Sequence, residues 1–318
     1  MNVLFLGGNR ENYVSGYYHR DFLAVVKMKN EVFCYGPGYP GYDTEDRLED
    51  VLEKMGALPD LIVLGTAWDR DDHPTEVDPH PAIRLDTTDI PKVMFLNKEY
   101  KKLDQRLAYI EGNGIDLVFS AVPSIVEGAS AGKAVFVRLP YAVNTDLFKD
   151  YGIPQDVDFG FSGNLHRRHT DIRFAIRETL KGPEFQSLDI YWGEWGNGAT
   201  FYGEDYARVI NHCKVFLSTP SALDIVGPRF YEVMACRRLL FCPESPEYAG
   251  LFEPGRHCVT FSPDLSDFRD KLFWILENPA EREAIAARAC DHVRARHSIA
   301  ARAEDFEWAL DAVLGLKR

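Results

Sequence analysis

The sequence has 318 residues, 46% of them hydrophobic, and 36 basic residues stand against 49 acidic ones, which gives a net charge of −13. This length exceeds what one hydrophobic core usually supports, so we expect two domains. The acidic balance argues against a nucleic-acid partner. The first apolar run spans only residues 3–7, too short for a signal peptide or a membrane span. Because the six cysteines form no C-x-x-C pair, we predict a cytoplasmic protein with reduced thiols.

The first half of the chain alternates short apolar runs with amphipathic helical patterns. The runs predict strands at 3–6, 31–35, 60–64, 93–96, 116–119 and 134–137. The patterns between them predict helices at 18–28, 45–55, 98–111 and 123–131. Strands joined by helical crossovers form a parallel sheet that is covered on both faces, and its ligands bind at the carboxyl ends of the strands.

The loop after the first predicted strand contains Gly8 and Asn9, and its glycines let the backbone come close to a ligand. It does not complete the G-x-G-x-x-G pattern of a dinucleotide fold, because Asn12 occupies the position of the third glycine. An enzyme that uses NAD is therefore disfavoured. Gly8 and Asn9 become candidates for a ligand-binding loop.

Polar residues also begin two of the predicted helices. His19 and Arg20 open the helix at 18–28, and Lys98 and Glu99 open the helix at 98–111. All four could contact an acceptor, and His19 or Glu99 could act as a general base. The same residue types are common as surface charges in the first turn of a helix, so the sequence leaves both interpretations open.

The loop after the third predicted strand carries an acidic pair, Asp69 and Asp71. Carboxylates in an Asp-x-Asp motif can hold Mn²⁺ or Mg²⁺ beside a diphosphate. Short acidic loops are also frequent in a chain with 49 acidic residues. The second half contains arginines at predicted helix starts, described below, that could neutralise phosphate without a metal. We therefore expect no metal and no other cofactor.

The second half begins after a segment rich in proline and glycine, which predicts a linker at 141–156. A strand at 158–162 follows, and Gly163 and Asn164 come directly after it. Arg167 and Arg168 then begin a helix that extends to residue 180. A glycine loop, a helix start and two guanidinium groups together predict an anion site, although a solvated basic turn would contain the same residues.

The remaining chain continues the alternation. Strands are predicted at 188–192, 214–217, 239–242 and 257–261, and helices at 228–237, 265–276, 279–296 and 299–314. The last helix has apolar residues that include Phe306 and Trp308. These could pack on the first domain or within the second.

The helix that begins at Pro228 carries the most informative group of residues. Gly227 interrupts the preceding segment and Pro228 presets the first helical turn, so the free N–H groups there can bind phosphate. Arg229 can add a forked cation for a diphosphate, and Glu232 can accept two adjacent hydroxyls, such as those of a ribose. Asp224, in the preceding loop, would face the group at the far end of the diphosphate. An amphipathic helix with an ion pair at its start is the alternative interpretation.

Asp224, seven further residues, Glu232 and then Met-Ala-Cys resemble the donor-site signature of group 1 glycosyltransferases. That family has the α/β fold called GT-B, two Rossmann-like domains whose parallel sheets face each other across a cleft. The spelling Arg-Phe-Tyr-Glu at 229–232 and the run Leu-Phe-Glu-Pro-Gly at 251–255 are most similar to the branch of the spore-maturation CgeB proteins. The resemblance extends over residues 159–306. One departure is Arg237, which stands where a glycine usually supplies a left-handed residue at the helix end.

The resemblance implies further site residues and a domain layout. It implies that the loop with Gly163, Asn164, Arg167 and Arg168 faces the donor diphosphate, and that Gly193 lies where the base is received. The expected domains are an N-terminal Rossmann-like acceptor-side domain at 1–140, a linker at 141–156 and a nucleotide-sugar-binding domain at 157–298. A terminal helix at 299–318 could pack back on the N-terminal domain.

We therefore predict a metal-independent glycosyltransferase that moves a sugar from a nucleotide diphosphate donor to a hydroxyl of a sugar, glycan or small-molecule acceptor. Arg229 would stabilise the departing diphosphate, and Asp224 would hold the sugar. Enzymes with a similar signature mostly retain the anomeric configuration. Two alternatives stay open: a nucleotide-sugar 2-epimerase with the GT-B fold, and a protein that binds a nucleotide sugar without catalysis.

Overall fold

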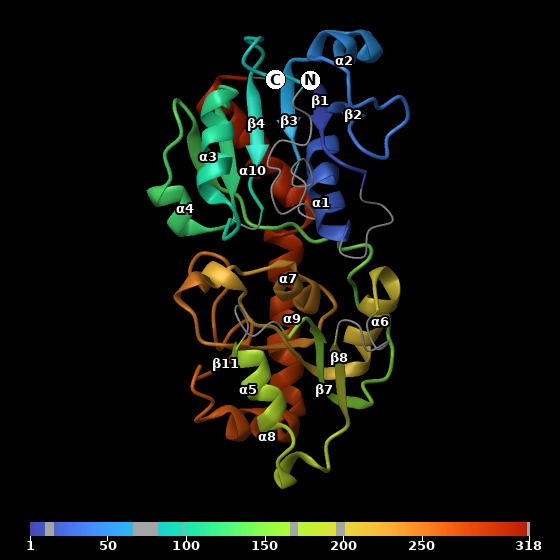
Figure 1. Ribbon diagram of the computed structural model, residues 1–318. Helices are drawn as coiled ribbons and strands as arrows, with labels where there is room; N and C mark the ends of the chain where they lie inside the picture. Colours follow the sequence, from blue (N-terminus) through green and yellow to red (C-terminus); the bar gives the residue numbers. More distant parts are fainter. Residues whose placement is uncertain (10–15, 66–81, 98, 166–170, 195–200, 317–318) are drawn as a thin grey trace. The chain divides into compact units, whose positions relative to one another are not determined.

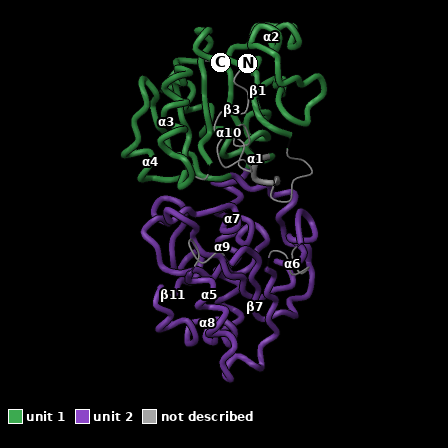
Figure 2. Tube along the Cα trace, viewed as in Figure 1, with its two compact units in different colours: residues 1–141, 299–318 green, residues 142–298 purple. Residues whose placement is uncertain are grey.

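The computed structural model describes residues 1–9, 16–65, 82–97, 99–165, 171–194 and 201–316 (Figure 1). The chain divides into two compact units (Figure 2). Unit 1 comprises Met1–Tyr141 and Ile299–Arg318, and unit 2 comprises Ala142–Ser298.

Unit 1 is built on a parallel sheet with the strand order β2-β1-β3-β4-β5-β6 among the described residues. The strands are β1 (Asn2–Leu6), β2 (Glu31–Tyr35), β3 (Leu61–Leu64), β4 (Lys92–Phe95), β5 (Leu117–Ser120) and β6 (Val135–Arg138). Every residue of β3, β4 and β5 is buried. This is the pattern expected for parallel strands with both faces covered.

The described helices of unit 1 are α1 (Gly16–Lys27), α2 (Leu48–Met55), α3 (Leu103–Gly112), α4 (Pro123–Gly128) and α10 (Ile299–Leu314). Helix α10 comes from the end of the chain, yet it supplies part of the core of unit 1. The ring of Phe306 lies 6.2 Å from that of Phe22 in α1 and 5.5 Å from that of Phe119 in β5. Asn30 also donates a hydrogen bond to Glu307 at 2.8 Å.

Unit 2 has a second parallel sheet, with the order β11-β10-β9-β7-β8 in the described part of the chain. Its strands are β7 (Val157–Gly163), β8 (Ile190–Glu194), β9 (Cys213–Leu217), β10 (Leu239–Pro243) and β11 (Val259–Phe261). Its described helices are α5 (Asp171–Thr179), α6 (Gly203–His212), α7 (Pro228–Ala235), α8 (Phe268–Glu277) and α9 (Pro279–Arg296), with short 3₁₀ turns η1 (Pro183–Phe185), η2 (Ala222–Asp224) and η3 (Pro246–Tyr248).

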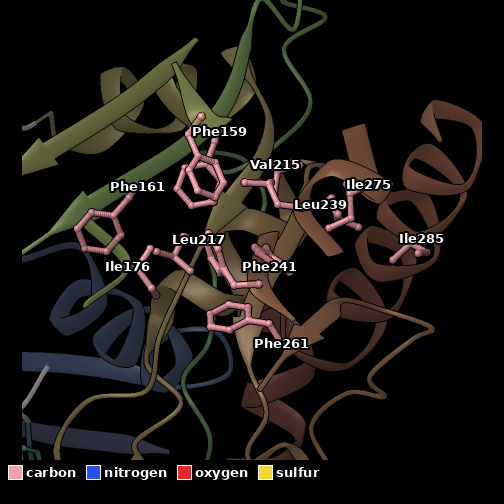
Figure 3. Close-up of a cluster of buried hydrophobic side chains, with 13 residues drawn as sticks. Phe159, Phe161, Ile176, Val215, Leu217, Leu239, Phe241, Phe261, Ile275 and Ile285 are labelled. Carbon is pink, nitrogen blue, oxygen red and sulfur yellow. The ribbon is translucent and has the colours of Figure 1, made fainter. Parts of the chain in front are cut away.

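Alternate residues of the strands in unit 2 form its core, as Figure 3 shows. Phe159 and Phe161 of β7 point to the same face of the sheet, because successive strand residues alternate between faces. Val215 and Leu217 continue this layer on β9, and helices α8 and α9 cover it with residues such as Ile275. A core of this kind fixes the strands whose carboxyl ends carry the candidate site.

Two local predictions were wrong for identifiable reasons. The helix predicted from residue 98 begins only at Leu103, because Lys102 takes a left-handed backbone with φ 52° that cannot continue a helix. Helix α7 ends without glycine, yet Arg237 adopts the left-handed conformation itself, with φ 54°. Its N–H and that of Arg238 donate back to Met234 and Val233, so the helix end is closed as a Schellman motif.

Candidate active site

The carboxyl ends of β7 and β9 form the centre of the candidate site in unit 2. Strand β7 ends at Gly163, and β9 ends at Leu217, just before Thr219. From β7 the chain passes first to β8 on one side and then to β9 on the other, so the point between β7 and β9 is a topological switch point. Open α/β sheets bind their ligands at such points.

Helix α7 places Arg229 beside the glycine that ends β7. A Cβ placed on Gly163 would lie 3.3 Å from both terminal nitrogens of Arg229. Arg229 Nε also donates a hydrogen bond to the buried Tyr206 hydroxyl at 3.1 Å, which holds the guanidinium in place. Two predicted donor-site residues from distant parts of the sequence thus lie side by side at the switch point.

A second arginine at this point, Arg173 of α5, was missed by the sequence-based prediction. Its side chain is buried and donates three hydrogen bonds: to Asn164 O at 3.0 Å, to Thr219 Oγ1 at 2.6 Å and to Thr219 O at 3.3 Å. The guanidinium carbons of Arg173 and Arg229 lie 5.8 and 5.9 Å from the centroid of the same Phe161 ring.

Burial and the neighbouring cation both act against the positive charge of Arg173. Burial, and next the positive charge of Arg229, lower the pKa of Arg173 to about 9. Arg173 is therefore still charged at neutral pH, in surroundings that favour an anion. A faint sequence signal existed: Arg173 lies three residues before the buried Ile176, on the inward face of an amphipathic helix.

The two carboxylates predicted to bind the donor lie in different surroundings. Glu232 is only 1% exposed, whereas Asp224 is exposed at the end of η2. Leu223 and Asp224 both have left-handed backbones, with φ 59° and 53°, a conformation that costs non-glycine residues roughly 1–3 kcal/mol each. The pKa of the Tyr206 hydroxyl is raised first by burial and then by the charge of Glu232, while Arg229 opposes the shift. Glu232 and Arg229 therefore act electrostatically on the same hydroxyl.

Gly193, predicted to receive the base, lies in β8 next to the candidate site. It pairs with Ser162 of β7 and is buried. The ring of the neighbouring Trp192 lies 4.3 Å from that of Phe161, tilted by 32°, and its Nε1 donates to Glu194 at 3.1 Å. The Trp192 ring is therefore held at the carboxyl end of the sheet, beside the Phe161 ring over which both guanidinium groups lie.

Several predicted residues lie outside the described part of the chain. They are Arg167, Arg168, Lys98, the pair Asp69 and Asp71, and the side chain of His19.

In unit 1, the predicted acceptor-side residues do not all lie in the same kind of environment. Gly8 and Asn9 follow β1, and the Asn9 N–H donates to Pro37 O at 2.7 Å, which continues the pairing of β1 and β2. Arg20 is exposed on α1. The carboxyl end of β1 is at the switch point of this sheet, between β1 and β3.

Glu99 is not a surface charge in the first turn of a helix, so that interpretation is wrong. It precedes α3, is 1% exposed and accepts a hydrogen bond from Ser120 Oγ at 2.7 Å. Nearby, Tyr141 donates to Asn97 Oδ1 at 3.2 Å. These contacts form a buried polar cluster at the carboxyl ends of β4 and β5.

His257, His292 and His297 form a row of neighbouring rings, and His297 contacts α7. His297 stacks 4.6 Å from Tyr231 of α7, and His292 and His297 both contact the carbonyl of Leu251, at 2.6 and 3.0 Å. His257 stacks 4.3 Å from His292. His297 therefore connects this row of rings to the helix that carries Arg229 and Glu232.

We expect the free energy of unfolding to fall as the pH decreases below about 6.5. Burial, then the neighbouring His292, lower the pKa of His257, and its Nδ1 accepts a hydrogen bond from the Glu253 N–H at 3.0 Å. The unfolded chain binds this proton at a higher pH than the folded chain does. The contribution of His257 to the free energy of unfolding is therefore fully present above the ordinary histidine pKa, and it is lost as the pH falls toward the lowered pKa of the folded state. Urea unfolding between pH 5 and 7.5 measures the slope, which His257→Gln should reduce. An equal slope in the variant would contradict this assignment.

A family model described as "Glycosyl transferase-like" matches residues 164–307, which include most of the candidate site in unit 2. No match was found among curated protein sequences.

Three solved structures are similar over almost the whole chain. Sucrose-phosphate synthase from Thermosynechococcus elongatus is 13% identical, with 99% of each chain covered and a TM-score of 0.62. HepE of Anabaena in complex with UDP and glucose is 13% identical, with 98% of this chain and 100% of that chain covered and a TM-score of 0.62. A glycosyltransferase from Rickettsia africae is 11% identical, with 99% of each chain covered and a TM-score of 0.62.

These similarities confirm the predicted α/β fold with two parallel sheets, GT-B. The predicted enzyme class, glycosyltransferase, is the class that the matching family model describes. None of the described helices is long and apolar enough to cross a membrane. Within the described residues, His, Cys, Asp and Glu form no group of three that could hold a metal ion.

Proposed function

We propose that this chain is a glycosyltransferase that binds a nucleoside diphosphate sugar in unit 2 and transfers the sugar to an acceptor hydroxyl. One observation carries the proposal. Arg229, at the start of α7, lies against the Gly163 turn at the switch point, with the buried Arg173 beside it. The Arg229 guanidinium at the start of α7, with the positive charge of Arg173 behind it, favours the binding of a diphosphate there.

The other predicted donor residues complete the proposed site. Glu232 would accept the ribose hydroxyls, and Asp224 would hold the hydroxyls of the sugar. The backbone of Gly193 and the Trp192 ring would receive the base. Arg167 and Arg168 would add positive charge at the diphosphate.

In the proposed reaction the bond between the anomeric carbon and the diphosphate oxygen breaks, and the acceptor oxygen forms a new bond to that carbon. The acceptor proton passes to the leaving diphosphate, so a retaining enzyme needs no protein base. Arg229 would stabilise the negative charge that grows on the diphosphate. If the enzyme inverts, His19 or Glu99 would take the proton instead. The acceptor would be a sugar, a glycan or a small molecule bound near Gly8, Asn9, Arg20 and Lys98.

The sequence resemblance supports membership of the CgeB-like branch, and the cysteine pattern supports a cytoplasmic location; both belong to this proposal. Uridine nucleotides are the first ligands to test, because the Anabaena HepE structures contain UDP and UDP-glucose.

A thermal-shift and calorimetric screen of nucleotide sugars tests the function. A ligand at one hundred times its Kd raises stability by about 2.7 kcal/mol, so a true donor gives a clear shift in melting temperature. Turnover without acceptor, seen as an isomerised sugar nucleotide, would indicate an epimerase. Tight binding with no turnover on a broad set of acceptors would indicate a binding protein. No shift with any nucleotide sugar would contradict the proposal.

Activity is expected to survive excess EDTA. The proposed site neutralises the diphosphate with guanidinium groups and helix N–H groups, so no divalent cation is needed. The double variant Asp69→Ala with Asp71→Ala should keep most of the activity. Loss of turnover with the chelator, restored by Mn²⁺, would favour the interpretation that the Asp-x-Asp pair holds a metal ion beside the diphosphate.

Glu232→Gln and Asp224→Asn are expected to differ in their effect on UDP binding. Glu232→Gln replaces a charged acceptor by a neutral one, and hydrogen bonds to charged groups contribute about 1.5–3 kcal/mol, so UDP affinity should fall. Asp224→Asn should leave UDP affinity within about twofold while it lowers turnover, since it would touch only the sugar. Calorimetry with UDP and kinetics with the sugar nucleotide measure the two effects. Equal losses of UDP affinity would contradict the assigned roles.

A further inference from the structure

Arg173 joins the two loops of the candidate site through a single side chain. Its Nη1 donates to the carbonyl of Asn164, in the loop after β7. Its Nε and Nη2 donate to the hydroxyl and the carbonyl of Thr219, in the loop after β9. These loops flank the switch point, so the planar guanidinium fixes the distance between the two sides of the site. Thr219 is itself 3% exposed, which leaves little freedom for another arrangement.

The charge of Arg173 is buried without a carboxylate partner among the described residues. Its hydrogen-bond acceptors are two carbonyls and one hydroxyl, all neutral. The nearest charge acting on it is the positive charge of Arg229. A buried cation beside a second cation is unfavourable unless an anion binds close by. The buried charge of Arg173 therefore favours the binding of an anion close by.

Arg173 and Arg229 differ in exposure and in hydrogen-bond partners, and this difference indicates different roles. Arg229 is partly exposed and held by Tyr206, whereas Arg173 is 7% exposed and holds the loops. Arg229 is therefore placed to touch the ligand, and Arg173 to act behind it. Both lie over the Phe161 ring, whose negative face favours cations.

We propose that Arg173 is a positioning residue of the donor site, which fixes the loops after β7 and β9 and makes the site selective for a diphosphate over a monophosphate. The inference rests on the proposed function and adds a residue that was not among the predicted ones. It requires the forked geometry of arginine, because one lysine ammonium cannot reach Asn164 and both acceptors of Thr219 in the same way.

The test compares Arg173→Lys with the wild type and with Arg282→Lys. Arg282 of α9 is also 7% exposed and donates to two backbone carbonyls, of Ile275 and Leu276, away from the site. The Kd values for UDP and for UMP are measured by calorimetry. The Kd for UMP divided by the Kd for UDP reports selectivity for the second phosphate. Arg173→Lys should weaken UDP about tenfold and reduce the ratio at least about fivefold, the range of one charge-assisted hydrogen bond. Arg282→Lys should leave the ratio within about twofold.

A merely structural role would give a different result. If Arg173→Lys lowered the melting temperature but weakened UDP and UMP equally, or left both unchanged, the proposal would be overturned. Thr219→Val removes only the hydroxyl that accepts from Arg173 Nε, and it should shift the ratio in the same direction by a smaller factor. This variant decides the matter if Arg173→Lys does not fold, and an unchanged ratio in it would then overturn the proposal. Failure of the wild type to bind UDP, GDP or ADP would instead refute the proposed function, and the role of Arg173 would fall with it.

Discussion

Arg229→Ala should lower kcat by about 10²- to 10³-fold and weaken UDP binding as well. The guanidinium lies at the start of α7 beside Gly163, where negative charge would grow as the sugar leaves. Removing one preorganised donor from such a site typically costs roughly 2.7–4 kcal/mol in the transition state. Because the same group would also bind the diphosphate before the reaction, kcat and the Kd for UDP should change together.

Steady-state kinetics and calorimetry measure this effect against a matched surface arginine. Arg269 of α8 is exposed, and within the described part of the chain its ion pair is with the neighbouring Asp270 and its cation–π contact with the Phe273 ring. Arg269→Ala should leave kcat and UDP affinity within about twofold, as expected for a surface site. The assignment of Arg229 would be refuted if Arg229→Ala kept its fold and its kcat stayed within tenfold of the wild type.

Gly36→Ala should destabilise the protein by roughly 2–6 kcal/mol, the largest effect that we expect on folding. Gly36 has φ +147°, which residues with a side chain rarely adopt, and a Cβ there would lie 2.4 Å from the carbonyl oxygen of Gly7. Backbone strain contributes roughly 1–3 kcal/mol and overpacking roughly another 1–3 kcal/mol. The clash is with backbone, so no rotation of a side chain can relieve it.

Two other glycines separate these contributions in urea unfolding. Gly41 has φ +78° but no atom within 4 Å of an added Cβ, so Gly41→Ala should show the backbone strain alone. Gly112, in α3, has free space around it, and Gly112→Ala should be neutral or slightly stabilising because alanine favours a helix. If Gly36→Ala and Gly41→Ala lowered the free energy of unfolding equally, the clash with the Gly7 carbonyl would add nothing to the backbone strain.

The sequence predicted the strands and most helices well because buried parallel strands appear as short apolar runs. The runs at Leu61–Leu64 and Leu117–Ser120, for example, are strands with every residue buried. Helix α6 was not among the predicted elements. Its buried residues, such as Tyr206 and Ile210, are spaced for a helix face, but Gly203 and Asn211 near its ends weaken the pattern.

Site residues with a local pattern could be predicted, and those defined only by tertiary contacts could not. Gly163 and Arg229 stand out because a glycine turn and a proline-started helix are local features. Arg173 has no such pattern, since its importance depends on Thr219, which lies on another strand. Glu99 was placed at a helix start from its sequence, and only the packing against Ser120 reveals that it is buried.

The position of α10 determines the order in which the two units can be completed during synthesis. Unit 2 is continuous in sequence, from Ala142 to Ser298, so all of its residues have been made before α10 is made. Unit 1 lacks Phe306 and its contacts with Phe22 and Phe119 until that point. Until then Phe22 and Phe119 lack the ring contacts that α10 supplies, and incompletely covered apolar surface is the kind that chaperones protect. Unit 1 begins to be made before unit 2, but its core is completed only after all of unit 2 has been made.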